Sequence, residues 1–114
     1  MPQPNKFIKY LLDIEAIISE LEIIIEYHES NYSSFESNII AIRTVERDLM
    51  IVGEAVSKLL TINPNIQISS SKDIVGLRNL IVHAYDSIEP AALWKILIKD
   101  IPLLKLVIQK IKNK

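Results

Sequence analysis

Residues 7–28, FIKYLLDIEAIISELEIIIEYH, decide the fold class, because their apolar side chains repeat with the period of a helix. Apolar residues recur at intervals of three and four positions, at Leu11, Ile14, Ile18, Leu21 and Ile25. These intervals place them on a single helical face. Isoleucine favours strands, but this preference is weak beside a sustained periodicity. The stretch therefore predicts a long amphipathic helix.

A second periodic stretch, residues 37–60, predicts another long helix. Ser33 and Glu36 stand three residues apart just before it, and this spacing suits a capping box that starts the helix. Residues 61–71 are polar and contain Pro64, so they indicate a loop. The two long helices then lie antiparallel.

The remaining sequence predicts two further helical segments. Ser71 or Asp73 can cap a short third helix that ends near Asp86. Pro90 suits the first turn of the last helix, and Pro102 should kink or divide that helix. No alternating pattern favours a sheet. We expect a single domain over residues 1–114, an all-α antiparallel bundle of four to five helices.

The composition excludes several kinds of functional site. The chain has no cysteine, which excludes disulfides, thiolate metal sites and cysteine nucleophiles. With only two histidines, a zinc site within one chain is not favoured. Two glycines are too few for a loop that cradles phosphate. We therefore expect no metal and no cofactor.

Hydropathy and charge bear on location and partners. No apolar run is long enough to cross a membrane, and the first residues lack a signal-peptide pattern, so we expect a cytoplasmic protein without membrane association. Residues 1–36 hold two lysines against seven acidic residues, a net charge of −5, and residues 37–114 carry a net charge of +4. The basic part either attracts an anionic partner or is an ordinary solvated lysine face.

The first predicted helix is apolar over more than one face. Ile23, Ile24 and Ile25 follow one another, which is wider than a single buried stripe requires. A second copy of the chain can cover such surface. The pattern therefore favours a homodimer.

Residues 78–87, RNLIVHAYDS, bring together the side chains most suited to chemistry. An arginine fork holds phosphate oxygens, and a histidine, with an unperturbed pKa of about 6.5, moves protons near neutral pH. RNA supplies its own nucleophile, the 2′-hydroxyl. On a straight helix, however, Arg78 and His83 would point about 140° apart. Either the helix ends before His83, or each residue meets partners from another chain.

Each of these residues also has an ordinary structural interpretation. A histidine near a helix end usually caps or packs, an arginine on a helix usually forms a surface ion pair, and Tyr85 can pack at the boundary of the core. Chemistry alone therefore does not make this chain an enzyme.

The order of motifs adds to this interpretation. ERDLMIVGEAVSKL is followed by a loop with Pro64, then by DIVGLRNLIVHAYDSI and later by ALWKILIKDIPLL. This order, with Arg-x4-His-x-Tyr and a polar Asn79 after the arginine, resembles the HepT family of HEPN-domain ribonucleases over residues 37–112. The first helix matches the family only in length and character.

The resemblance implies a homodimeric α-helical bundle that cleaves RNA without metal and leaves a 2′,3′-cyclic phosphate. Arg78 would then stabilise the charge of the transition state, His83 would transfer a proton, and Asn79 would orient the site. The site would lie in a cleft between two subunits. Such a shared site would resolve the 140° mismatch, because one chain need not close it alone.

The resemblance also implies a partner, because family members are commonly encoded beside an MntA-type minimal nucleotidyltransferase antitoxin, in a type VII-like toxin–antitoxin pair. Across the family this enzyme transfers AMP to the tyrosine of the motif, which is Tyr85 here. The added negative charge and adenosine would occupy the phosphate site and exclude RNA. Whether transfer RNA or messenger RNA is cut stays open.

Glu54 occupies a position that is acidic in the family pattern. Its structural interpretation is an ion pair with Arg43 or Arg47, or support of Arg78; its functional interpretation is a supporting role in the site. Two alternatives to the toxin also stay open. The chain could be a non-catalytic substrate-binding or regulatory subunit of a nucleotidyltransferase, or a purely structural dimerising bundle.

Overall fold

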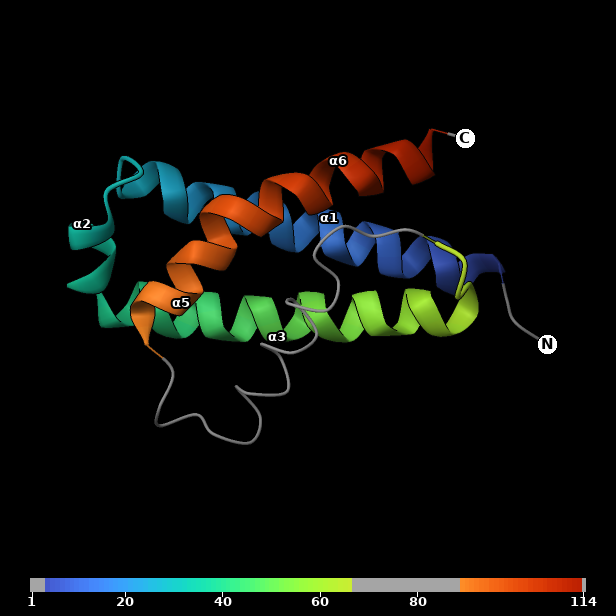
Figure 1. Cartoon of the computed structure of the whole chain (residues 1–114), viewed down its shortest axis with the longest axis horizontal. Coiled ribbons are helices and arrows are strands. Elements are labelled where there is room, and N and C mark those ends of the chain that lie inside the picture. The colour runs from blue at the N-terminus through green and yellow to red at the C-terminus, as the bar shows by residue number, and fades with distance from the viewer. Residues whose placement is uncertain (1–3, 67–88, 114) are drawn as a thin grey trace.

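The computed structural model describes residues 4–66 and 89–113, and every element in these ranges is helical (Figure 1). The elements are α1 (Pro4–Tyr27), α2 (Tyr32–Glu36), α3 (Ile39–Ile62), α5 (Pro90–Lys95), the π-helical turn η1 (Ile96–Asp100) and α6 (Ile101–Lys112). The predicted all-α class is therefore confirmed. The predicted third helix, from Ser71 or Asp73 to Asp86, lies outside the described residues.

The two long helices form the base of the bundle. α1 and α3 run antiparallel along each other, and α6 lies against α1 (Figure 1). The periodic apolar face predicted for α1 is the buried one, since Leu11, Ile14, Ile18 and Leu21 are all at most 3% exposed. These side chains pack in one core with apolar residues of α3, α5, η1 and α6. Burial of side chains this large, each contributing about 1.5–3 kcal/mol, drives the assembly.

Asparagines start α2 and α3, which corrects the predicted capping box. The Oδ1 atom of Asn31 accepts from the backbone N–H of Ser34 at 3.1 Å, and that of Asn38 accepts from Ala41 at 3.2 Å. Ser33 instead lies inside α2, and the carboxylate of Glu36 accepts from the Tyr32 hydroxyl. The helical backbone is interrupted twice in this region, before α2 and before α3. Asparagine is a favourable N-cap residue at both interruptions.

Asn38 also joins the end of α1 to the start of α3. Its Nδ2 lies 3.2 Å from Nε2 of His28, and Nδ1 of His28 lies 2.7 Å from the carbonyl oxygen of Ile24. The network assigns the proton to Nδ1, so that His28 donates to Ile24 and accepts from Asn38. The histidine is buried, and it is therefore a structural residue that satisfies its own ring nitrogens.

Asn38→Ala is expected to destabilise the protein by about 2–3 kcal/mol, because it removes a helix cap and leaves a buried ring nitrogen without its donor. Urea unfolding followed by circular dichroism measures this loss. Asn31→Ala is the matched control, because Asn31 caps only the five-residue α2. Equal losses in the two variants would contradict the linking role of Asn38.

An aromatic cluster holds α5 against the turn between α1 and α3. The rings of Phe35 and Trp94 lie 5.0 Å apart, and Tyr32 lies 6.1 Å from Trp94. Phe35 is fully buried and also meets His28 edge-on at 6.0 Å. Pro90 occupies the first turn of α5, as predicted, where its missing N–H costs nothing. The last helix thus begins at a fixed point beside α2.

Pro102 divides the last helix, as predicted. A proline cannot donate to the carbonyl four residues earlier, and its ring crowds that carbonyl. The five residues before Ile101 form the wider π turn, in which the N–H of Ile101 donates to the carbonyl of Ile96. α6 then continues as regular α-helix to Lys112.

Among the helices that the structure describes, none combines the length and the apolar character that a membrane span requires.

Candidate functional site

The motif that carries most of the predicted site lies in residues 67–88, outside the described residues. This applies to Arg78, Asn79, His83 and Tyr85. Their roles therefore stay predictions. Among the predicted site residues, the structure places Glu54, which lies in the middle of α3 and is half-buried.

Glu54 borders a shallow cavity between α1 and α3. The cavity has a volume of about 290 Å³, and Met50, Ile51 and Ala55 form its apolar wall. Tyr10 and Asp13 of α1 border it on the other side. Glu54 is thus placed at a boundary between apolar packing and polar groups, which is compatible with either of its predicted roles.

The arginines considered as partners of Glu54 contact other carboxylates. Arg43 Nη1 lies 2.6 Å from Oε1 of Glu46, and Arg47 Nη1 lies 3.4 Å from Oδ1 of Asp48. At about 1.5 Å per residue, Arg43 is some 16 Å along the helix from Glu54, too far for an ion pair. Both arginine side chains are 65% exposed, so α3 presents two cations to solvent.

Asp48 is a buried acid that the sequence interpretation missed. Its side chain is 0% exposed, and within the described part of the chain its Oδ2 atom has no hydrogen-bond partner. Burial and the negative charge of Glu20 raise the pKa of Asp48 to about 6, although Arg47 lowers it. A carboxyl group in such surroundings holds its proton closer to neutral pH than an exposed one does.

The spacing of α3 contained a signal for Asp48. Val45, Asp48, Val52 and Ala55 follow one another at intervals of three and four residues, and all four are buried. An acidic residue at a position where the helical period predicts an apolar one therefore indicates a buried acid. Within the described ranges, no group of three or more histidine, aspartate or glutamate side chains could hold a metal ion.

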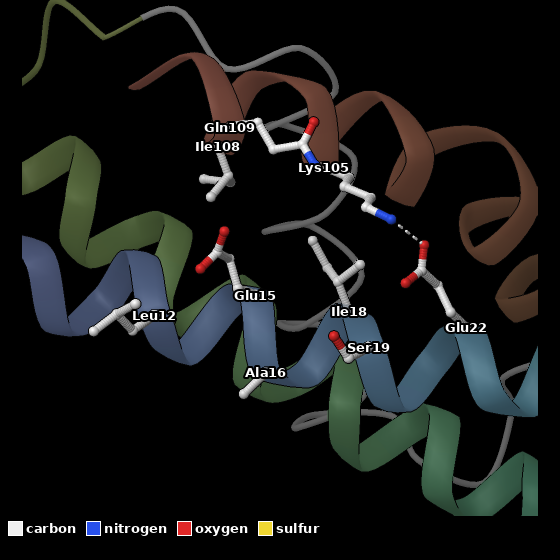
Figure 2. A pocket seen from close by; sticks show the side chains of 9 residues that line it. All are labelled: Leu12, Glu15, Ala16, Ile18, Ser19, Glu22, Lys105, Ile108 and Gln109. Atoms are coloured by element: carbon white, nitrogen blue, oxygen red, sulfur yellow. Dashed lines mark hydrogen bonds and ion pairs between the residues drawn. The ribbon is translucent and has the colours of Figure 1, made fainter. Parts of the chain in front are cut away.

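A second cavity lies between α1 and α6, and Figure 2 shows the ion pair of Lys105 with Glu22 at its edge. Its volume is about 390 Å³. Lys105 reaches across from α6 to Glu22 of α1 at 2.7 Å, and Lys112 reaches Glu15 at 2.8 Å. Lysines that the sequence suggested for an anionic partner are therefore partly engaged within the chain.

The sequence is similar to one ribonuclease family over most of its length. The family model for the HepT-like ribonucleases, described as Ribonuclease HepT-like, matches residues 14–111. This range includes the positions of Arg78, His83 and Tyr85. Solved structures give no match.

Two curated relatives agree with the family model. Putative RNase MJ1380 of Methanocaldococcus jannaschii is 34% identical over 95 residues, which cover 78% of this chain and 84% of the relative. Putative RNase TTE0752 of Caldanaerobacter subterraneus subsp. tengcongensis is 28% identical over 103 residues, which cover 89% of this chain and 92% of the relative. The matched range, the identity and the helical fold lead to one conclusion: this chain belongs to the HepT-like ribonuclease family.

Proposed function

We propose that this protein is the toxin of a toxin–antitoxin pair, an endoribonuclease that works without metal as a homodimer. The observation that carries the proposal is the family match over residues 14–111, which runs through the Arg-x4-His-x-Tyr motif in this chain. Residues 1–114 would act as a single catalytic domain.

The proposed reaction is an internal displacement at phosphorus. The 2′-hydroxyl oxygen of RNA attacks the adjacent phosphate, the bond to the 5′-oxygen of the next nucleotide breaks, and a 2′,3′-cyclic phosphate results. His83 transfers a proton between these oxygens, and Arg78 stabilises the charge that develops on the phosphate. Asn79 orients the reacting groups. Because the two oxygens lie on opposite sides of phosphorus, side chains from two subunits suit the reaction.

Charge on α3 and on the last helix supports an RNA substrate. Arg43 and Arg47 are largely exposed, and Lys95, Lys99 and Lys110 lie on the exposed side of the last helix. The whole chain carries a net charge of −1, so attraction to RNA has to be local. Binding of this kind weakens as salt is added.

Regulation follows from the tyrosine of the motif. In this proposal an MntA-type nucleotidyltransferase adds AMP to the Tyr85 hydroxyl: the phenolic oxygen attacks the α-phosphate of ATP, and pyrophosphate leaves. The new phosphodiester places a negative charge and an adenosine next to Arg78. This product competes with RNA for the same phosphate-binding side chains.

One experiment tests activity and regulation together. The chain is expressed alone and with its nucleotidyltransferase neighbour, and each product is weighed by mass spectrometry and assayed on transfer RNA and messenger RNA in EDTA. We expect the unmodified chain to cleave RNA and leave cyclic phosphate ends. The co-expressed chain should gain one or more AMP units on Tyr85 and lose cleavage.

Tyr85→Phe is the matched control, because it removes the acceptor oxygen and keeps the ring. This variant should stay unmodified and active in the presence of the nucleotidyltransferase. An unmodified chain that binds the nucleotidyltransferase and cleaves neither RNA would contradict the proposal and favour the non-catalytic subunit.

A further inference from the structure

The cavity between α1 and α6 has the size and the mixed lining of a small-molecule site. Its volume of about 390 Å³ lies within the range of ligand pockets, which starts at roughly 300 Å³. Ile18 and Ile108 contribute to the apolar part of the lining, and both are at most 2% exposed. The remaining question is which ligand the polar part of the lining suits.

Two carboxylates of α1 border the cavity, Glu15 and Glu22. They are seven residues apart, which is about two helical turns, so they share one face of α1 and lie about 10.5 Å apart along its axis. Figure 2 shows both side chains on the side of α1 that faces α6. A ligand that contacts both carboxylates must therefore be elongated along the helix.

Each of these carboxylates has only one oxygen bonded to a lysine. Lys105 donates to Oε2 of Glu22 at 2.7 Å, and Lys112 donates to Oε1 of Glu15 at 2.8 Å. Within the part of the chain that the structure describes, the second oxygen of each carboxylate accepts no hydrogen bond. Both side chains are partly exposed, at 46% and 33%. Each can therefore accept from a further cationic donor while its lysine stays in place.

Neutral polar side chains lie between the two carboxylates. Ser19 stands four residues after Glu15 and three before Glu22, and Gln109 stands one turn after Lys105 on α6. Among the described residues, neither side chain takes part in a hydrogen bond. The middle of the cavity therefore offers oxygen acceptors that carry no charge.

Acidic groups outnumber basic ones around the cavity. The lining contains two carboxylates and the single ammonium group of Lys105, whereas Lys112 is not part of the lining. Residues 1–36, which include α1, carry a net charge of −5. The local potential therefore favours a cation over an anion.

We infer that this cavity binds a linear polyamine, a chain of methylene groups that joins several ammonium groups. One terminal ammonium donates to Glu15 and the other to Glu22, in charge-assisted hydrogen bonds. The methylene groups cover Ile18 and Ile108, and an inner ammonium group donates to the neutral oxygens between the carboxylates. A compact cation reaches only one carboxylate at a time. The site does not depend on the proposed ribonuclease activity.

Calorimetric titration of the full chain with spermidine tests the inference, because extended spermidine is about as long as two helical turns. The protein is freed of RNA and kept at low salt, since salt screens such contacts. We expect one spermidine per chain. Putrescine, a shorter diamine that does not span both carboxylates, should bind more weakly, and Mg²⁺ should not displace spermidine at equal concentration.

Three variants locate the site. Glu15→Gln and Glu22→Gln each remove one charged acceptor and keep the shape of the side chain, so each should raise the Kd for spermidine about tenfold. Both residues are partly exposed and their ion pairs contribute little stability, so the variants should fold. Glu26→Gln is the matched control, because Glu26 is an exposed acid of α1 outside the cavity, and it should leave the Kd unchanged.

Three results would overturn the inference. One is no binding up to about 1 mM spermidine, which corresponds to a negligible affinity. Another is an unchanged Kd in both Glu15→Gln and Glu22→Gln. The third is a loss in Glu26→Gln as large as in the cavity variants, which would indicate diffuse attraction to the acidic first helix and no defined site.

Discussion

His83→Ala is expected to lower the rate of RNA cleavage by about 10²–10⁴-fold, which is the usual contribution of a positioned proton-transfer group. Arg78→Ala should lower it by about 10²–10³-fold, because the charge on the phosphate loses its fixed donors. Arg78→Lys keeps the charge but not the two-pronged geometry of the guanidinium. Its cleavage rate should therefore lie between those of the wild type and Arg78→Ala. Single-turnover cleavage of a labelled RNA measures all three rates.

The two histidines of the chain provide a matched control. His28 is buried and bonded to Ile24 and Asn38, so His28→Ala should lower the unfolding midpoint while each folded molecule keeps its cleavage rate. If His83→Ala keeps the wild-type cleavage rate, the proposed mechanism is wrong.

Asp48→Asn is expected to stabilise the protein by about 1–3 kcal/mol at pH 7.5. At this pH the folded protein holds a buried carboxylate with an oxygen that lacks a partner in the described structure. The amide of asparagine has nearly the same shape, carries no charge and can donate a hydrogen bond toward Glu20. Replacing a poorly compensated buried charge by a neutral group of equal size is commonly stabilising.

The stability gained by Asp48→Asn should depend on pH. Because folding raises the pKa of Asp48 from 3.8 to about 6, the folded state binds the proton more tightly than the unfolded state. The contribution of Asp48 to stability is therefore unchanged below about pH 4, falls between pH 4 and pH 6, and stays low above it. The difference between Asp48→Asn and the wild type should be small at pH 4 and largest above pH 6.

Urea unfolding at fixed protein concentration over pH 4–8 measures these differences. Asp13→Asn is the control, because Asp13 is an exposed partner of Lys9 and should change stability by less than about 1 kcal/mol. An Asp48→Asn variant that is less stable than the wild type at pH 7.5 would show that the charged form is well stabilised.

Local signals in the sequence predicted the helices well. The intervals of α1 identified its buried face, and Pro90 and Pro102 placed the start and the division of the last helix, because proline acts through its own backbone. The start of α3 was predicted wrongly, since Ser33 and Asn38 are both good caps and only the packed turn selects between them. Where two neighbouring residues can both cap a helix, tertiary contacts decide which of them does so.

The candidate site, too, was predicted only in part from the sequence. The order of motifs predicted the ribonuclease family, which the family model confirms. Asp48 was missed because its burial depends on α1 lying against α3, a contact that intervals within α3 only suggest. The exact surroundings of Arg78 and His83 depend on two chains in our proposal, and a pattern in one chain does not specify them.

The π turn at Ile96–Asp100 has a consequence for the last helix as a whole. A π turn contains one residue more than an α turn. The side chains that follow it are therefore rotated about the helix axis by up to about 100° relative to those of an uninterrupted α-helix. Trp94 before the turn meets the aromatic rings near α2, and Lys105 after it meets the acidic side of α1. The two parts of the last helix thereby pack against two separate neighbours, the aromatic cluster near α2 and the acidic side of α1, and no loop is needed between them.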